Sequence, residues 1–210
     1  MKSQQMWNKL AGNWDKPGVG LGENDKKIIE KVRPYLSSDS VMLDYGCATG
    51  SIVLELAASV KKAYGLDFSR IMIDKASQKA ANRKTENVSF IAGTIFDENL
   101  EEGSYDVILA LSVLHLLENK KEALNRIYNL LKPGGIFITV NPCLKEKNII
   151  SPFLRSFLFL AFAVRLLPRV KMYTKTELEQ DLARAHFKIL DNTSLAVNIL
   201  DERYIAAKGA

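Results

Sequence analysis

The stretch DYGCATG, residues 44–50, follows the apolar run SVML and has the composition of a tight turn between a buried strand and a helix. The dinucleotide-binding fingerprint G-x-G-x-x-G would require glycine at three positions where the chain has Gly46, Ala48 and Ser51. A phosphate-binding P-loop is also excluded, because no Gly-Lys-Ser/Thr sequence follows. The remaining pattern, D-x-G-x-x-x-G, predicts a turn whose backbone can approach a ligand closely but which provides no pyrophosphate cradle.

Strands and helices alternate on both sides of this turn. Apolar runs predict strands at residues 40–46, 61–67, 87–93, 105–111 and 134–140, and two closing strands at 188–194 and 198–208. Helical periodicity predicts helices at residues 23–36, 51–59, 69–83, 120–131 and 174–187. We therefore expect an α/β fold that is Rossmann-like and doubly wound, with a mostly parallel seven-stranded sheet, helices on both faces and a helical cap insertion.

The composition is that of one globular domain, residues 1–210, with a net charge of +5. Seven basic residues and one acidic residue lie between positions 145 and 175, so the positive charge belongs to one segment, and a nucleic-acid partner is not indicated. The two cysteines, Cys47 and Cys143, lack metal-ligand spacing and favour a reducing compartment. The first residues lack an apolar signal core, so we expect a cytoplasmic protein.

Asp67 ends the second expected strand, 21 residues after Gly46. In open α/β sheets, ligands bind beyond the carboxyl ends of the strands, and an acid at this place can accept hydrogen bonds from both ribose hydroxyls. Either feature alone is common in proteins without such a ligand. Together, and in this order, they favour a nucleoside-binding site.

Five segments in order carry a family resemblance: VMLDYGCATG, GLDFS, FIAGTIFD, SYDVILALSVLHLL and LLKPGGIFI. Their order and spacing resemble those of the class I S-adenosylmethionine-dependent methyltransferases, and most closely the small-molecule branch that includes quinone and lipid methylases. The resemblance covers roughly residues 7–135. It implies S-adenosyl-L-methionine as cofactor, S-adenosyl-L-homocysteine as product, and no metal.

The resemblance also implies where the cofactor lies. Asp44, Gly46 and Gly50 would surround its methionine part, and Asp67 would hold the ribose. Cys47, between the two glycines, is expected to be a small packing residue of the same turn.

The remaining cofactor contacts follow the second, third and fourth strands. Phe68 would pack on the adenine. The family often has Asp where Thr94 stands, to bind the adenine amino group, and a threonine oxygen can accept a weaker hydrogen bond there. Ile95 would form an apolar wall, and Ala110 and Leu111 would border the sulfonium.

Two further positions depart from the family pattern. Residues 1–22 resemble the leading segment that covers the cofactor, with Trp14 in the place of a frequent tyrosine. Ala48 replaces a middle glycine and is expected to fit if its φ is negative. Together with Thr94, Ala48 keeps open a second interpretation, a non-catalytic binding or membrane-adaptor module.

His115 is the candidate catalytic base. Methyl transfer is an in-line displacement that depends mainly on positioning in a dry pocket, and a base is needed only when the acceptor must lose a proton. A histidine with a pKa near neutrality suits that role, although a histidine in an apolar run also often bonds a backbone carbonyl. His186, at the end of the last expected helix, is interpreted as a helix-end residue.

The basic apolar insertion, residues 145–173, departs most from the family pattern. Residues 157–164 are eight uninterrupted apolar residues, but flanking arginines and Pro152 keep the run below a membrane-spanning length of about 20 residues. One interpretation is a cap that closes an acceptor pocket. The other adds peripheral contact of residues 149–171 with an anionic membrane, at its inner face.

The acceptor itself is expected to be small and apolar or lipid-like. Exocyclic-amine methylases of nucleic acids resemble one another in an Asn/Asp-Pro-Pro-aromatic sequence after the fourth strand, where this chain reads ALSVLH. A protein substrate stays open, because acceptor pockets vary freely within one fold. The sequence leaves the oligomeric state undetermined.

Overall fold

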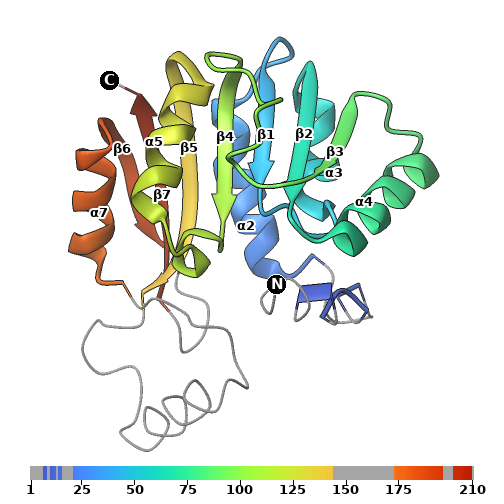
Figure 1. Ribbon diagram of the computed structural model, residues 1–210, viewed down its shortest axis with the longest axis horizontal. Coiled ribbons are helices and arrows are strands. Elements are labelled where there is room, and N and C mark those ends of the chain that lie inside the picture. Colours follow the sequence, from blue (N-terminus) through green and yellow to red (C-terminus); the bar gives the residue numbers. More distant parts are fainter. Residues whose placement is uncertain are drawn as a thin grey trace, which may run out of the picture.

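One seven-stranded sheet organises the chain, in the order β3-β2-β1-β4-β5-β7-β6 (Figure 1). The computed structural model describes residues 7, 8, 10–12, 14, 15, 21–143, 173–195 and 201–209. The strands are β1 (Val41–Tyr45), β2 (Lys62–Asp67), β3 (Val88–Ala92), β4 (Tyr105–Leu111), β5 (Leu131–Cys143), β6 (Phe187–Ser194) and β7 (Asp201–Gly209). The first five run parallel, and β7 lies antiparallel between β5 and β6.

Helices cover both faces of the sheet, as the sequence predicts (Figure 1). They are α2 (Glu23–Val32), α3 (Ser51–Leu56), α4 (Arg70–Arg83), α5 (Lys120–Leu130) and α7 (Lys175–Arg184), with 3-10 turns η1 (Arg33–Tyr35), η2 (Ala57–Ser59) and η3 (Leu114–Leu116). Two buried cores result. Val32 of α2 and Val53 of α3 pack in one, and Leu124 of α5 and Leu182 of α7 pack in the other.

Side-chain capping explains where two helices begin. Ser69 precedes α4 with extended backbone, and its Oγ accepts a hydrogen bond from the Met72 amide at 3.3 Å, which confirms the predicted N-cap. Thr174 precedes α7 in a capping box with Glu177. The helix expected over residues 174–187 ends earlier than predicted, at Arg184.

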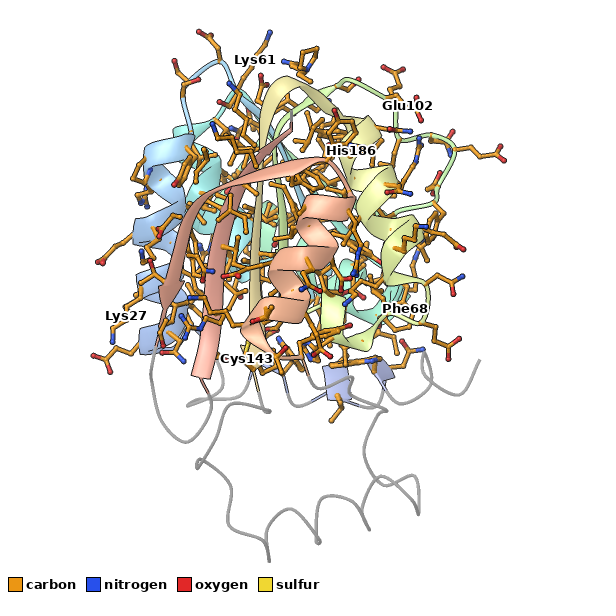
Figure 2. All side chains as sticks on the ribbon, turned by 90° about the vertical axis from the view of Figure 1, so that its left-hand side faces the viewer. Lys27, Lys61, Phe68, Glu102, Cys143 and His186 are labelled. Atoms are coloured by element: carbon orange, nitrogen blue, oxygen red, sulfur yellow. The ribbon has the colours of Figure 1, made fainter. Side chains whose placement is uncertain are left out.

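The parallel strands place their carboxyl ends on one edge of the sheet. Figure 2 shows Phe68 and Cys143, which follow or end such strands, at this edge, and Lys61 and Glu102 at the opposite end. The sheet order changes direction between β1 and β4, because β2 and β3 extend to one side of β1 and β4 and β5 to the other. A ligand site is expected at this switch point.

The predicted cap insertion, residues 145–173, lies outside the described residues except for Tyr173. Its interpretations as a pocket cap and as a membrane contact through residues 149–171 therefore stay predictions. Within the part of the chain that is described, no helix has the length and apolar character needed to cross a bilayer.

Candidate functional site

A cavity of about 420 Å³ opens at the carboxyl ends of β1, β2, β3 and β4. Most of its lining side chains are apolar, and a few acidic and polar groups interrupt them, as is usual for small-molecule sites. The lining residues are Trp7, Trp14, Tyr45, Gly46, Ala48, Asp67, Phe68, Met72, Thr94, Leu111, Ser112, Val113, His115, Leu116, Leu117 and Glu118.

The turn after β1 forms one wall of the cavity. The amides of Gly46 and Cys47 both donate to the Leu66 carbonyl of β2, at 2.7 and 3.1 Å. Gly46 has φ +81°, and a Cβ atom there would lie 2.8 Å from a Val113 methyl group. Glycine at position 46 is therefore required both by the backbone conformation and by the close approach of the loop after β4.

Gly50 has a structural role in the turn that leads from β1 into α3. It has φ +73°, and a Cβ atom there would lie 2.6 Å from the Phe90 ring of β3. Gly50 is buried and does not line the cavity. Its glycine therefore permits the turn into α3 and the packing of that turn on β3.

Ala48 corrects an expectation, because its φ is +48° and not negative. Its amide donates to Asp67 Oδ2 at 3.0 Å, so the left-handed conformation aims a backbone N–H at the carboxylate. An L-residue with a Cβ atom is strained in this region. The strained residue thus lies at the cavity wall and donates a hydrogen bond to Asp67.

We expect Ala48→Gly to stabilise the protein by about 1 kcal/mol, because glycine removes the left-handed strain but costs backbone entropy on folding. Urea unfolding would measure this as a higher midpoint with an unchanged slope. Ala81→Gly, at an exposed position of α4, is the matched control and should destabilise by a similar amount. A loss of stability in Ala48→Gly would contradict the strained conformation.

Asp67 stands at the cavity with both carboxylate oxygens engaged. Oδ1 accepts from the Ser69 amide at 2.8 Å, and Oδ2 accepts from the Ala48 amide at 3.0 Å. Burial raises the pKa of Asp67, and these two amides oppose the rise. Each carboxylate oxygen has a further lone pair, so Asp67 can still accept hydrogen bonds from a diol.

Asp44 lies deeper, at the end of β1, and is 3% exposed. Its Oδ1 atom has no hydrogen-bond partner among the described residues. Burial, and secondarily the charge of Asp67, raises the pKa of Asp44 to about 7. A buried carboxylate oxygen without a partner is costly, and positive charge or a hydrogen-bond donor beside Asp44 would reduce that cost.

The N-terminal residues Trp7 and Trp14 form the outer wall of the cavity. Their rings meet edge to face, with centroids 5.9 Å apart. Asp15 fixes the end of this stretch, because it accepts from Thr49 at 2.9 Å and pairs with Lys79 of α4 at 2.6 Å. The stretch is therefore tied to both the β1 turn and α4.

His115 belongs to η3, lines the cavity and is 8% exposed. Burial lowers the pKa of His115, and the side chain of Asn141 partly opposes this. The Nδ1 atom is buried without a hydrogen-bond partner among the residues described. The histidine is therefore held neutral at the cavity wall, which is the form that can accept a proton.

His186 lies far from this site. Figure 2 shows His186 at the end of the molecule opposite Phe68. It has φ +64° directly after Ala185, the C-cap of α7, and its ring lies 5.8 Å from that of Tyr128. It is a helix-end residue, as the sequence predicts, in the left-handed conformation that often ends a helix.

The cavity brings together seven of the twelve predicted site residues: Trp14, Gly46, Asp67, Phe68, Thr94, Leu111 and His115. The other five are buried behind the lining: Asp44, Cys47, Gly50, Ile95 and Ala110. Direct cofactor contact of these five is not seen in the cavity geometry and stays a prediction. The described residues contain no group of three or more side chains arranged to hold a metal ion.

Sequence reasoning missed several lining residues, chiefly in the loop after β4. Ser112, Val113, Leu116, Leu117 and Glu118 line the cavity because the switch point brings this loop against the β1 turn. Their position in the sequence could have indicated these residues, because the loop follows β4, which lies next to β1 in the sheet. Trp7, Tyr45 and Met72 were also missed.

The sequence matches the family described as Methyltransferase domain over residues 36–190. The chain therefore belongs to this family, which confirms the resemblance to S-adenosylmethionine-dependent methyltransferases. Two relatives are demethylmenaquinone methyltransferases. That of Lactococcus lactis is 28% identical over 145 residues, 65% of this chain and 57% of the relative. That of Lactiplantibacillus plantarum is 26% identical over 158 residues, 71% of this chain and 66% of the relative, so the chain spans about three fifths of their length.

Solved structures share the fold. A SAM-dependent methyltransferase from Aquifex aeolicus has a TM-score of 0.72 at 17% identity, covering 97% of this chain and 98% of that one. A geranyl diphosphate C-methyltransferase from Streptomyces coelicolor, in complex with Mg²⁺, geranyl diphosphate and S-adenosyl-L-homocysteine, has a TM-score of 0.72 at 14% identity. The match covers 89% of this chain and 79% of the S. coelicolor protein. The Rossmann-like sheet is thus confirmed.

Proposed function

We propose that the chain transfers a methyl group from S-adenosyl-L-methionine to a small, apolar or lipid-like acceptor by in-line displacement. One observation carries this proposal: two buried carboxylates, Asp44 and Asp67, at the ends of neighbouring strands beside an otherwise mostly apolar cavity. A cationic nucleoside with a ribose diol satisfies both acids, one by charge and one by hydrogen bonds.

The cofactor-binding residues divide the cavity into three regions. Asp67 would hold the ribose, and Phe68 and Thr94 would enclose the adenine. The unpaired Oδ1 of Asp44 and the close backbone at Gly46 suit the methionine end. When bound, the cofactor supplies an electrophilic methyl group on a sulfonium.

The apolar half of the cavity is the proposed acceptor site. Val113, Leu116 and Leu117 line the cavity, and their side chains carry no charge or metal ligand that could bind an acceptor. Apolar walls exclude water and would hold the nucleophile near the methyl group, which is the main source of rate for such a displacement. The names of the two bacterial relatives, which refer to a quinone, support an acceptor of this class.

His115 would take the proton that the acceptor loses. It lines the cavity, and burial keeps its pKa below the ordinary value, so it is neutral at physiological pH. The proposal predicts a turnover that falls as the pH drops through this lowered pKa, because the protonated ring cannot accept a proton.

We expect His115→Ala to lower kcat by about 100-fold, the usual contribution of a positioned base. Affinity for S-adenosyl-L-homocysteine should change little. Tritium transfer from labelled cofactor to a short-chain hydroquinone would measure kcat, and calorimetry would measure the affinity. His186→Gln is the control, because His186 lies at the opposite end of the molecule.

Unchanged turnover in His115→Ala would remove His115 from the mechanism. Cofactor binding by the natural chain, with no transfer to any acceptor of this class, would favour the non-catalytic binding module.

A further inference from the structure

A cluster of three side chains reaches the turn η3 from parts of the chain that are distant in sequence. Tyr173, which is 5% exposed, donates from its hydroxyl to the Leu114 carbonyl of η3 at 3.2 Å. The Nζ atom of Lys120, the first residue of α5, lies 3.6 Å from the centroid of the Tyr173 ring. Lys120 also forms an ion pair with Asp181 of α7. The loop that follows β4 is therefore bonded to the segment that leads into α7.

The chemistry of Tyr173 makes its hydroxyl the donor in the bond to Leu114. A backbone carbonyl only accepts, so the phenol must supply the proton. Burial, and secondarily the charges of Asp181 and Glu177, raises the pKa of Tyr173 to about 12, so the hydroxyl keeps that proton at physiological pH. The Leu114 carbonyl also accepts from the Leu117 amide, at 3.3 Å. One oxygen thus carries both the internal bond of η3 and its bond to Tyr173.

Lys120 holds the ring of Tyr173 in place. A cation within about 6 Å of a ring centroid is attracted to the ring face, and the attraction grows as water is removed from the cation. The side chain of Lys120 is only 13% exposed. The ion pair with Asp181 fixes the ammonium group over the ring, so the ring, the cation and the carboxylate form one connected cluster.

Local structure does little to fix η3 by itself. The turn is three residues long, and among the residues that the structure describes no side chain caps its start or the start of α5, which follows it. Ser112, two residues before η3, has φ +56°, which is a strained conformation for a residue with a Cβ atom. Strained backbone persists only where the surrounding structure holds it, so this loop depends on contacts from elsewhere in the chain.

We propose that Tyr173, held by Lys120 and Asp181, is a positioning residue that fixes η3 as a wall of the acceptor site. His115 and Leu116 of η3 line the cavity, whereas Tyr173 is not among the lining residues. Tyr173 therefore acts on the acceptor only through η3. The inference rests on the proposed function, because this wall affects turnover only if its half of the cavity takes the acceptor.

Hydrogen exchange of the ligand-free protein measures how firmly η3 is held. Tyr173→Phe keeps the ring beside Lys120 and removes only the hydroxyl. In this variant we expect the amides of Leu116 and Leu117, which donate to carbonyls of the same turn, to exchange about fivefold faster, the usual effect of one lost hydrogen bond. The amides of β4 should exchange at unchanged rates, because a local opening leaves the sheet intact.

Substitutions of Lys120 test the contribution of its charge. Lys120→Met removes both the cation over the ring and the ion pair with Asp181, so exchange in η3 should again be faster. Lys120→Arg keeps a cation at this position and should retain the natural exchange rates. Lys121→Met, at the exposed neighbouring position, is the matched control and should leave the exchange of η3 unchanged.

The positioning role also predicts that KM and kcat respond differently. In Tyr173→Phe, the KM for a short-chain hydroquinone should rise by up to about fivefold, because the acceptor binds only those molecules whose wall is in place. The kcat and the affinity for S-adenosyl-L-homocysteine should stay unchanged, since the wall is in place once the acceptor is bound.

Equal exchange of η3 in Tyr173→Phe and in the natural chain would overturn the inference, and so would an equal acceleration in β4. An unchanged KM despite faster exchange of η3 would contradict a role of Tyr173 in acceptor binding. Faster exchange confined to η3, in a chain that transfers no methyl group to an acceptor of this class, would refute the proposed function and leave the positioning of η3 by Tyr173 intact.

Discussion

Asp67→Ala is expected to weaken binding of S-adenosyl-L-homocysteine by about 100-fold, which corresponds to two lost charge-assisted hydrogen bonds to a ribose diol. Asp67 is 8% exposed and lines the cavity, so we expect no solvent-exposed group to replace its carboxylate as the hydrogen-bond acceptor of the diol. Isothermal titration calorimetry on the two proteins would measure the loss.

Asp74→Ala provides the matched control for Asp67→Ala. Asp74 is an acid of the neighbouring α4 whose side chain is 66% exposed in a pair with Arg70, so its removal should leave the affinity unchanged. Because Asp67 also accepts the amides of Ala48 and Ser69, the unfolding of each variant must be checked beside its affinity. Equal affinities of Asp67→Ala and the natural chain would exclude a ribose at Asp67.

Asp44→Asn is expected to have opposite effects on stability and on cofactor binding. Burial raises the pKa of Asp44 to about 7, so the folded ligand-free protein binds this proton more tightly than the unfolded chain. The resulting stability is fully present below the unfolded value of 3.8 and is lost as the pH rises through about 7. Above that pH, the Asp44→Asn variant should be more stable than the natural chain, with its buried carboxylate, by about 2 kcal/mol or more.

The same substitution should weaken cofactor binding by about 10- to 100-fold, because a buried carboxylate is the natural partner of the cationic methionine end. In the natural chain, the affinity should rise with pH up to about 7 and then level off, since binding favours the ionised Asp44. Calorimetry in two buffers of different ionisation enthalpy would detect the released proton. Asp44→Asn should remove the contribution of Asp44 to the pH dependence of stability in this range, and with it the release of this proton on binding.

If Asp44→Asn bound the cofactor as tightly as the natural chain while gaining stability, the raised pKa would reflect burial alone. Asp44 would then be a structural acid beneath Gly46.

Most of the fold could be predicted from the sequence, because its parallel strands are short apolar runs separated by clear turn and capping residues. The strand predicted at residues 105–111 is β4 without change, and Ser69 caps α4 as expected. The predicted ends of the helices agreed less well with the structure. The last helix, α7, ends at Arg184 because Ala185 and His186 leave the helical conformation. Neither residue is a typical helix-ending residue such as glycine, so the sequence did not indicate this end.

The candidate site divides into predictable and unpredictable parts for a physical reason. Residues at the end of a single strand, such as Gly46 and Asp67, can be predicted from the local sequence pattern. The wall formed by Val113 and Leu117 depends on the approach of two loops that are distant in sequence, so local patterns do not indicate it. The positive φ of Ala48 was missed for a related reason, since its amide hydrogen bond is made to Asp67, which is distant in the sequence.

A crystal structure of the chain grown with S-adenosyl-L-homocysteine would test the central claim most directly. We predict the ribose diol at Asp67, the adenine between Phe68 and Thr94, and the homocysteine amino group within hydrogen-bonding distance of the Asp44 carboxylate or the Gly46 backbone. Density for the ligand elsewhere on the molecule, or none in this cavity at a saturating ligand concentration, would contradict the assignment of the cavity as a methyl-donor site.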